Sequence, residues 1–301
     1  MCVFPDLFIV IVNYNLKDDT IECIDSYLNS GAELDHIIIV DNASSDGSVD
    51  ALVERYGPDL MIIQAAENRG YPHALNLGIP KALERGAQWV LLSNNDVIVD
   101  KKLLSELEKS SLTDPRVGLI GPLILYYEAP EIIWFLGHRI IPGTLIGVGF
   151  YRGKHVSDKL PPYVPTDMVH GCVMAVKRDV FETIGLFDDS QLIYGDDPDF
   201  CWRAKQKGFS AIGATRAKVW HKISLTMNIQ KPRTRYLRIR NTIFFYRRYS
   251  RGLTYIIMVT FTFFRGIAMS IRDLLKRHTE LIPPLWYGWW DGWLGKVDNR
   301  Y

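Results

Sequence analysis

Four short apolar runs alternate with amphipathic segments over the first 112 residues, and this alternation constrains the fold more than any other feature of the chain. The runs cover residues 8–12, 37–40, 61–64 and 89–93. Between and after them, apolar residues recur at helical spacing, which predicts helices at residues 18–29, 48–56, 73–85 and 101–110. Continuous apolar runs are typical of strands in a parallel sheet, because helices cover both of its faces. The sequence therefore predicts an α/β fold with a mostly parallel central sheet flanked by helices.

A polar group follows each of the four apolar runs. These groups are Asn13-Tyr14-Asn15, Asp41-Asn42, Glu67-Asn68-Arg69-Gly70 and Asn94-Asn95-Asp96. The carboxyl ends of parallel strands meet at one edge, where such sheets bind their ligands, so we expect these residues to surround a pocket. Ordinary caps and turns explain one such group, whereas four in succession favour a binding site.

The pattern changes in the second half of the chain. Residues 126–165 are rich in Gly, Pro and aromatic residues and show poor helical periodicity, which predicts hairpins and a long loop over the site. Short helices are predicted at residues 180–185 and 199–207.

The densest acidic cluster in the chain consists of Asp196, Asp197 and Asp199. Like charges this close repel, so the cluster requires a metal, a basic partner, or a carboxylate whose pKa is raised until it serves as a base. We predict that Asp197 is this base. Asp199 precedes a predicted helix, and acidic residues favour helix starts, so a capping role is favoured for it.

The formal net charge of +1 conceals an uneven distribution, because residues 231–277 contain many Lys and Arg and a single acid, Asp273. This segment favours an anionic partner, either membrane lipid or a nucleotide. Nucleic acid is the third option, and we predict none because no nucleic-acid-binding module is evident. The four cysteines lack metal-ligand spacing, and no basic segment precedes an apolar run at the N-terminus. We therefore expect a cytoplasmic protein without a signal peptide.

Residues 231–301 are predicted to be a basic, apolar helical region appended to a catalytic domain of residues 1–230. Within it, residues 247–277 are predicted to form one amphipathic helix whose basic stripe contacts anionic lipid at the inner face of the cell membrane. Arg265 argues against a spanning helix, because a charge within the hydrocarbon is costly. The tryptophans that follow suit headgroup depth; they are Trp286, Trp289, Trp290 and Trp293. The alternative is a helix that packs on the catalytic domain or on a second subunit in a homodimer.

The order of these motifs over residues 7–250 resembles that of family 2 glycosyltransferases, which have the GT-A fold and use nucleotide sugars, and among them the rhamnosyltransferase-like members of bacteria and archaea. Asn94-Asn95-Asp96 resembles the metal motif of that family, Asp196-Asp197-Pro198-Asp199 its base motif, and Trp220-His221 its late histidine. The groups after the first three apolar runs resemble its nucleotide-binding segments, the third of which extends to Asn76 and Gly78.

The resemblance implies a role for each matching residue. Asp96 and His221 are expected to hold Mn²⁺ or Mg²⁺, although a core or interface histidine is the alternative for His221. The residues expected at the nucleotide sugar are Asn13, Tyr14, Asn15, Asp41, Arg69, Asn76, Asn94 and Asn95. A solvated loop cation is an equal alternative for Arg69. The residues expected on the acceptor side are Gly171, Asp196 and Trp202, and packing in the core is the favoured alternative for Trp202.

The implied activity is transfer of a sugar, with inversion, from a UDP or dTDP sugar to a hydroxyl of a glycan or lipid-linked acceptor. Three departures from the family pattern are present. The metal motif keeps only its last carboxylate, Asp96, and Asp196 replaces a glutamate. The Gln-x-x-Arg-Trp signature of processive synthases is missing, since Arg233 of Gln230-Lys231-Pro232-Arg233 is followed by Thr234. We therefore expect one sugar to be added per encounter.

Two other functions are alternatives for this sequence. A sugar nucleotidyltransferase would carry a Gly-rich N-terminal loop, where this chain has Asn13-Tyr14-Asn15. A non-catalytic, nucleotide-sugar-binding scaffold subunit at the membrane would not need Asp96, Asp197 and His221 together.

Overall fold

The four apolar runs form the parallel part of one large sheet. The computed structural model describes residue 4 and residues 7–157, 159–190, 192–222 and 231–296. Its first strands lie side by side in the order β3-β2-β1-β4 and are parallel throughout. They are β1 (Leu7–Asn13), β2 (Ile37–Asp41), β3 (Met61–Gln64) and β4 (Trp89–Asn94). The predicted strands are confirmed to within two residues.

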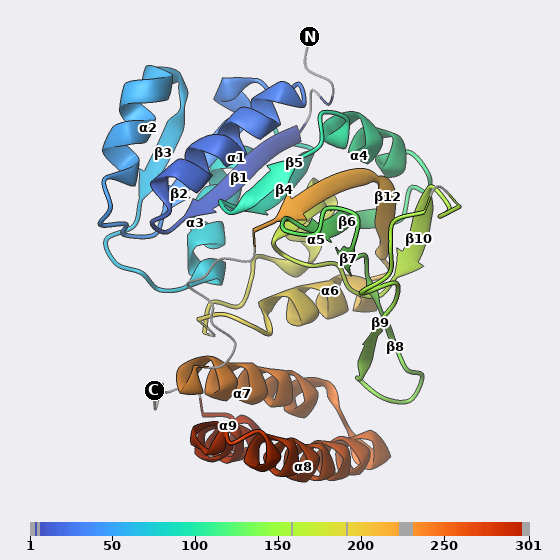
Figure 1. Ribbon diagram of the computed structural model, residues 1–301. Helices are drawn as coiled ribbons and strands as arrows, with labels where there is room; N and C mark the ends of the chain where they lie inside the picture. Colours follow the sequence, from blue (N-terminus) through green and yellow to red (C-terminus); the bar gives the residue numbers. More distant parts are fainter. Residues whose placement is uncertain (1–3, 5–6, 158, 191, 223–230, 297–301) are drawn as a thin grey trace.

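Helices cover both faces of this sheet (Figure 1). They are α1 (Lys17–Asn29), α2 (Ser48–Tyr56), α3 (Tyr71–Glu84) and α4 (Leu103–Ser111). Successive strand residues point to opposite faces, so Ile9 and Ile11 pack in one hydrophobic layer while Val10 and Val12 pack in the other. Every residue of β1 is buried, which explains its continuous apolar sequence.

The rest of the sheet is mixed. Strand β11 (Val173–Lys177) runs antiparallel between β4 and β6 (Val117–Tyr126), and β12 (Ser210–His221) is parallel to β6. A strand that lies parallel to the strand before it needs a crossover connection, usually a helix. The described residues of 126–165, which lie between β6 and β11, contain no helix, and β11 is antiparallel to β6. The prediction of a mostly parallel sheet is therefore confirmed for the first four strands, and the rest of the sheet is mixed, with β12 parallel to β6 and β11 antiparallel to both of its neighbours.

Residues 126–165 form short strands and a hairpin, as predicted. Strand β7 (Ile133–Phe135) pairs with β6, and β10 (Tyr163–Thr166) pairs with β12. The hairpin of β8 (His138–Ile140) and β9 (Gly147–Gly149) projects away from the sheet toward the C-terminal helices (Figure 1). Its tip contacts them, since Thr254 Oγ1 donates a hydrogen bond of 3.2 Å to the carbonyl of Gly143.

Two further helices precede the C-terminal region, α5 (Arg178–Ile184) and α6 (Asp196–Gln206). The predicted start of α6 was three residues late, so Asp199 lies inside the helix and does not cap it. Its buried carboxylate instead accepts hydrogen bonds from Arg203 (2.7 Å), Arg248 (3.0 Å) and Tyr249 (2.5 Å). Asp199 thereby ties α6 to the C-terminal helices.

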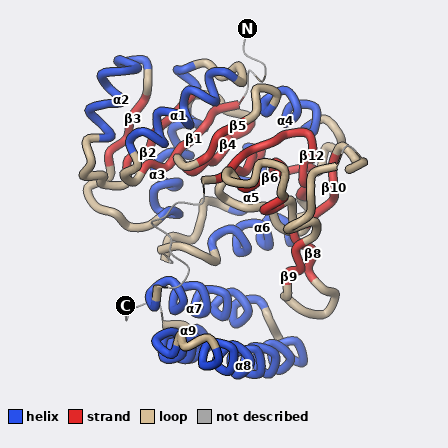
Figure 2. The backbone as a smooth tube through the Cα atoms, in the orientation of Figure 1, coloured by secondary structure: helices blue, strands red, loops and turns tan. Residues whose placement is uncertain are grey.

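Three helices form a separate layer below the sheet (Figure 2). They are α7 (Pro232–Tyr249), α8 (Gly252–Leu275) and α9 (Ile282–Leu294), with the 3₁₀ turn η4 (Thr279–Leu281) before α9. Helices α7 and α9 pack closely because Gly288 and Gly292 carry no side chain. A Cβ atom would lie 2.7 Å from the Tyr236 carbonyl oxygen at the first glycine and 2.8 Å from the Arg240 carbonyl oxygen at the second.

The prediction of one helix over residues 247–277 was wrong. The backbone of Ser250 is extended, with ψ of 144°, so α7 ends there and α8 begins at Gly252. Arg247 therefore lies on a different helix from Arg265, and the predicted basic stripe is divided between α7 and α8. Gln230, the first residue of the segment compared with the signature of processive synthases, lies outside the described residues.

Helix α8 buries a narrow face and exposes a broad one. Its buried residues are Met258, Thr262, Gly266 and Asp273. Large apolar side chains are exposed on the rest of the helix, and they are Leu253, Ile256, Ile257, Phe263, Phe264, Ile271, Leu274 and Leu275. Among the described residues, α8 is the one helix that is long and apolar enough to cross a membrane, by length and composition alone.

Candidate active site

The register of the parallel strands brings the polar groups together at the carboxyl edge of the sheet. Asn13 is paired with Asp41, and Val12 with Asn94. The side chain of Asn13 donates a hydrogen bond of 2.6 Å to Asp41 Oδ1, and its Oδ1 atom accepts one of 3.0 Å from Asn95. Asn13, Asp41 and Asn95 are all buried, so they hold the edge together from within.

The loops that follow β1 and β2 are linked in the same way. The backbone N–H of Asn15 donates to Ser44 Oγ (2.8 Å), and the N–H of Ser45 donates to Asn15 Oδ1 (2.9 Å). Tyr14 lies between these contacts with 44% of its surface exposed. Of the three residues after β1, Tyr14 is therefore the most accessible to a ligand.

The other predicted donor-side residues lie at different depths. Arg69 is exposed in the loop between β3 and α3. Asn76 is partly buried on α3, where its amide donates to the Phe187 carbonyl (2.9 Å) and accepts from the Phe187 N–H (3.1 Å). These two hydrogen bonds hold the segment before the acidic cluster against α3.

Asp96 and His221 meet at the same edge. Strand β12 pairs with β5 (Val97–Val99), and His221 lies opposite Val97, directly after Asp96. His221 Nε2 is 3.2 Å from Asp96 Oδ1, and both side chains are buried. Asn94 also contacts this carboxylate, since its amide donates to Asp96 Oδ1 at 3.3 Å.

This pair fits a divalent metal. A carboxylate oxygen and an imidazole nitrogen 3.2 Å apart can both reach an ion at about 2.1 Å. The chain also holds an exposed group of possible ligands, Glu33, Asp35 and His36. That group precedes β2 and so lies at the opposite edge of the sheet from Asp96.

Asp197 lies in the first turn of α6, beside the start of β11. Its Oδ2 atom accepts a hydrogen bond of 2.8 Å from the backbone N–H of Gly171, whereas Oδ1 is buried with no hydrogen-bond partner among the described residues. A Cβ atom on Gly171 would overlap Oδ1. Tyr71 fixes the same segment, since its hydroxyl donates to the Gly171 carbonyl at 2.7 Å. The carboxylate is thus held with one oxygen unused.

Two neighbouring carboxylates of the acidic cluster, Asp196 and Asp197, have raised pKa values. Burial raises the pKa of Asp197 well above its ordinary value, and the charge of Asp196 raises it further. Burial and the neighbouring Asp199 raise the pKa of Asp196 to about 6. Burial and a like charge both disfavour the ionised form, so Asp197 holds a proton more tightly than an ordinary aspartate.

Two residues that the sequence did not single out, Trp134 and His170, connect Asp197 to His221. The Trp134 ring lies 4.7 Å from the ring of His170 and 4.9 Å from that of His221. His170 Nδ1 accepts a hydrogen bond from the Cys172 N–H (3.1 Å), and burial lowers the pKa of His170 to about 3. His170 is therefore neutral, and its 3.7 Å contact with Asp197 Oδ2 is not an ion pair.

Trp202 lies on α6 and packs against α7. Its ring is 6.1 Å from that of Tyr249 and 6.4 Å from that of Phe245. These contacts agree with the packing role that the sequence favoured for Trp202.

Comparisons with known proteins agree on one class. The family model described as Glycosyl transferase family 2 matches residues 8–185. A low-salt glycan biosynthesis hexosyltransferase, Agl10, of Haloferax volcanii is 27% identical over 95% of this chain and 90% of its own length. An N-acetylglucosaminyl-diphospho-decaprenol L-rhamnosyltransferase of Mycobacterium tuberculosis is 26% identical over 62% of this chain and 66% of its own.

The fold is also found among solved structures. The mannosyltransferase PcManGT of Pyrobaculum calidifontis, solved with GDP-Man and Mn²⁺, superposes with a TM-score of 0.59 and 17% identity. The superposition covers 97% of this chain and 88% of that one. The likeness identifies the fold as GT-A.

We expect the substitution Asp196→Asn to lower the pKa of Asp197, because it removes the neighbouring negative charge while burial remains. The measurement is a ¹³C NMR titration of labelled aspartate carboxyls in the wild type and the variant. Glu54→Gln, at an exposed position on α2, is the control and should leave the titration unchanged. A pKa of Asp197 that stays the same or rises in Asp196→Asn would contradict the argument.

Proposed function

The chain belongs to glycosyl transferase family 2, and on that premise we propose that it transfers a sugar from a nucleotide diphosphate sugar to a hydroxyl group of a glycan or lipid-linked acceptor, with inversion at the anomeric carbon. The observation that supports the proposal is the contact of Trp134 with both His170 and His221, because His170 contacts Asp197, the proposed base, and His221 contacts Asp96, its proposed partner in metal binding.

In the proposed mechanism, Asp197 is the general base. The Gly171 N–H holds Oδ2, and the unpartnered Oδ1 accepts the proton of the acceptor hydroxyl. The raised pKa of Asp197 makes it a stronger base than an ordinary aspartate. The oxygen then attacks the anomeric carbon directly as the nucleotide diphosphate leaves, and a single displacement inverts the configuration.

Asp96 and His221 would hold Mn²⁺ or Mg²⁺. A divalent ion there supplies positive charge to the oxygens of the leaving diphosphate. The two side chains are fixed for this role by the pairing of β12 with β5. Asn94 orients the carboxylate of Asp96 through its hydrogen bond.

The nucleotide is proposed to be UDP or dTDP, bound at the ends of β1 and β2. Asp41 is the candidate acceptor for the imide N–H of uracil or thymine, or for the ribose. Tyr14 is the exposed aromatic residue beside it, and Arg69 is the exposed cation of the next loop. Asn13, Asn15, Asn76 and Asn95 would shape this region through the hydrogen bonds described above.

We propose that residues 231–301 dock the catalytic domain, residues 1–230, on the inner face of the cell membrane. The support is the broad apolar face that α8 exposes, with Trp290 exposed on α9. The M. tuberculosis relative is named for an acceptor on a polyprenol, which suits an enzyme docked on lipid. A homodimer that covers the same face is the alternative.

We expect Asp197→Asn to lower turnover by about two to four orders of magnitude, because the amide cannot accept the proton. Affinity for the nucleotide should remain within about twofold. Steady-state kinetics and calorimetric titration with the nucleotide measure the two effects. Asp197 is not the base if the variant retains near-normal turnover. Asp59→Asn, at an exposed position, serves as the control for charge removal.

Treatment with a chelator should abolish transfer, and Mn²⁺ or Mg²⁺ should restore it. Asp96→Asn and His221→Ala should each raise the metal concentration that gives half-maximal activity, because each removes a ligand. The measurement is activity titrated with metal after exhaustive dialysis. Full activity in excess chelator would reject the metal site.

UDP and dTDP should bind more tightly than GDP, since the proposed pocket recognises a pyrimidine imide through Asp41. Calorimetric titration with the three nucleotides in the presence of Mn²⁺ measures the order. Tighter binding of GDP would count against the pyrimidine preference without affecting the assignment of the base.

The full chain should sediment with anionic liposomes at low salt. Replacing the exposed apolar residues of α8 by Ile256→Ser and Phe264→Ser should weaken this binding, because less apolar surface enters the interface. The matched control is Val53→Ser with Leu112→Ser, two exposed apolar residues remote from the C-terminal helices. If both double variants sediment like the wild type, or if the wild type stays in the supernatant, the dimer alternative is favoured and light scattering tests it.

A further inference from the structure

A cavity lined by four arginines lies between the three C-terminal helices. Its volume is about 260 Å³. Arg235 and Arg238 line it from α7, and Arg265 and Arg272 line it from α8. Leu285 and Trp289 of α9 contribute apolar surface. The cavity therefore combines concentrated positive charge with an apolar wall.

Among the described residues, the arginines that line this cavity carry more positive charge than the carboxylates beside them neutralise. The buried carboxylate of Asp273 lies 3.1 Å from Arg235 and 3.1 Å from Arg272. Among the described residues, no ion pair joins Arg238 or Arg265 to a carboxylate. Within the part of the chain that the structure describes, Asp273 is thus the one carboxylate that pairs with any of these four guanidinium groups, and it offsets a single positive charge.

Arg235 shows the cost of this arrangement most clearly. Its side chain is only 11% exposed. Burial lowers the pKa of Arg235, the charge of Asp273 opposes this effect, and the like charges of Arg272 and Arg238 add to it. A bound anion would relieve both the repulsion and the loss of hydration.

We propose that this cavity binds the phosphate or diphosphate group of a lipid-linked acceptor. The proposal rests on the proposed function, since it specifies the acceptor of the same reaction. Guanidinium groups suit phosphate, because their planar N–H donors form paired, charge-assisted hydrogen bonds to its oxygens.

The surroundings of the cavity favour a lipid over free phosphate. The cavity opens between helices whose outer surfaces carry exposed apolar side chains, among them Phe263, Phe264 and Ile271 of α8. Trp286 and Trp289 pack against Phe263, so an aromatic cluster adjoins the arginines. A free phosphate ion gains nothing from this apolar surface, whereas a lipid chain does.

The cavity is also connected to the base. Arg238 stacks over the Tyr194 ring, with its guanidinium carbon 5.6 Å from the centroid. Asn241, one turn further along α7, donates a hydrogen bond of 2.5 Å to the Ile193 carbonyl. Ile193 and Tyr194 lead directly into the first turn of α6, which carries Asp197. A phosphate held by Arg238 would therefore lie beside the segment that carries the base.

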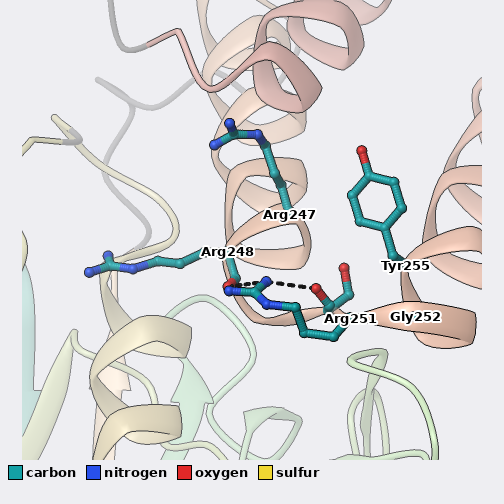
Figure 3. Close-up of a pocket in the computed structure, with 6 residues that line it drawn as sticks. Arg247, Arg248, Arg251, Gly252 and Tyr255 are labelled. Atoms are coloured by element: carbon teal, nitrogen blue, oxygen red, sulfur yellow. Dashed lines mark hydrogen bonds between the residues drawn. The ribbon is translucent and has the colours of Figure 1, made fainter.

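A second basic hollow, at the junction of α7 and α8, is less suited to an anion. Figure 3 shows Arg247, Arg248 and Arg251 there, with the Arg251 guanidinium turned onto the backbone. Arg248 pairs with Asp188 at 2.6 Å and with Asp199 at 3.0 Å. Arg251 donates to the carbonyls of Arg248 (3.0 Å) and Ser250 (2.8 Å). Arg248 and Arg251 are therefore already engaged in contacts within the protein.

The test is calorimetric titration of the full chain with farnesyl diphosphate below its micellar concentration, and separately with inorganic pyrophosphate. The cavity variant is Arg238→Gln with Arg265→Gln. The matched control is Arg233→Gln with Lys276→Gln, which removes the same charge from exposed positions on α7 and just after α8 that do not line the cavity. The single variant Arg265→Gln is a milder second test, and circular dichroism verifies folding.

We expect the cavity variant to bind farnesyl diphosphate at least about tenfold more weakly than the wild type, because each lost guanidinium removes a charge-assisted hydrogen bond. Arg265→Gln alone should show a smaller loss in the same direction, and the control pair should stay within about twofold. Pyrophosphate should bind more weakly than farnesyl diphosphate. Equal losses in the cavity and control pairs, or no loss in either, would overturn the proposal, and so would pyrophosphate binding as tight as that of farnesyl diphosphate.

Titration with UDP separates this inference from the proposed function. Both double variants should bind UDP like the wild type, since their residues lie outside the proposed nucleotide region. If no nucleotide or nucleotide sugar binds the wild type but farnesyl diphosphate binding depends on Arg238 and Arg265, the proposed donor fails and the lipid phosphate site stands.

Discussion

The reversed direction of β11 is the constraint on which the candidate site depends. In a purely parallel sheet, only carboxyl ends meet at the ligand-binding edge. Because β11 is antiparallel to β4, its amino end lies at that edge, and the Asn94 N–H donates to the Cys172 carbonyl at 2.9 Å. Gly171 is thereby placed beside the end of β4, which lies two residues before Asp96. The first turn of α6 then packs on Gly171, so Asp197 lies at the same edge of the sheet as Asp96 and His221.

The three carboxylates of the acidic cluster have different partners, and these partners indicate a different role for each. Asp199 is neutralised by Arg203 and Arg248 and anchors α7 to α6. Among the described residues, Asp197 accepts a hydrogen bond from the Gly171 N–H and contacts the neutral His170, and no cation pairs with it. Asp196 raises the pKa of Asp197 by its own charge. One short acidic segment thus supplies an anchor, the carboxylate proposed as the base, and a neighbour that raises the pKa of that carboxylate.

The first four strands and the helices between them were predictable because their apolar spacing is a local signal, whereas β6, β11 and β12 were not predicted as strands. Residues 48–56 and 61–64 were assigned with the ends that the structure shows, since turn residues border both segments. The direction of β11 was not predictable, because no local pattern distinguishes an antiparallel strand buried on both faces from a parallel one. The break at Ser250 was missed because apolar and basic residues continue at helical spacing across it.

The site was predictable only in part. Motif order singled out Asp96, Asp197 and His221, and the structure brings Asp96 and His221 into contact. Trp134 was missed because it lies in the irregular region of residues 126–165, where only the tertiary fold shows that its ring contacts His170 and His221. His170 directly precedes Gly171, which the sequence assigned to the acceptor side. This adjacency was the one sequence signal that could have identified His170 as a site residue.

The hydrogen bonds of Asn13 have a consequence for the thermodynamics of binding. They join the ends of β1 and β2 to Asn95 and Thr20, so segments distant in sequence share one network. The conformational entropy of these segments is lost when the chain folds, and a ligand does not have to order them again. Binding at this part of the edge should therefore show a small entropic penalty, with little change in the mobility of the loops around β1.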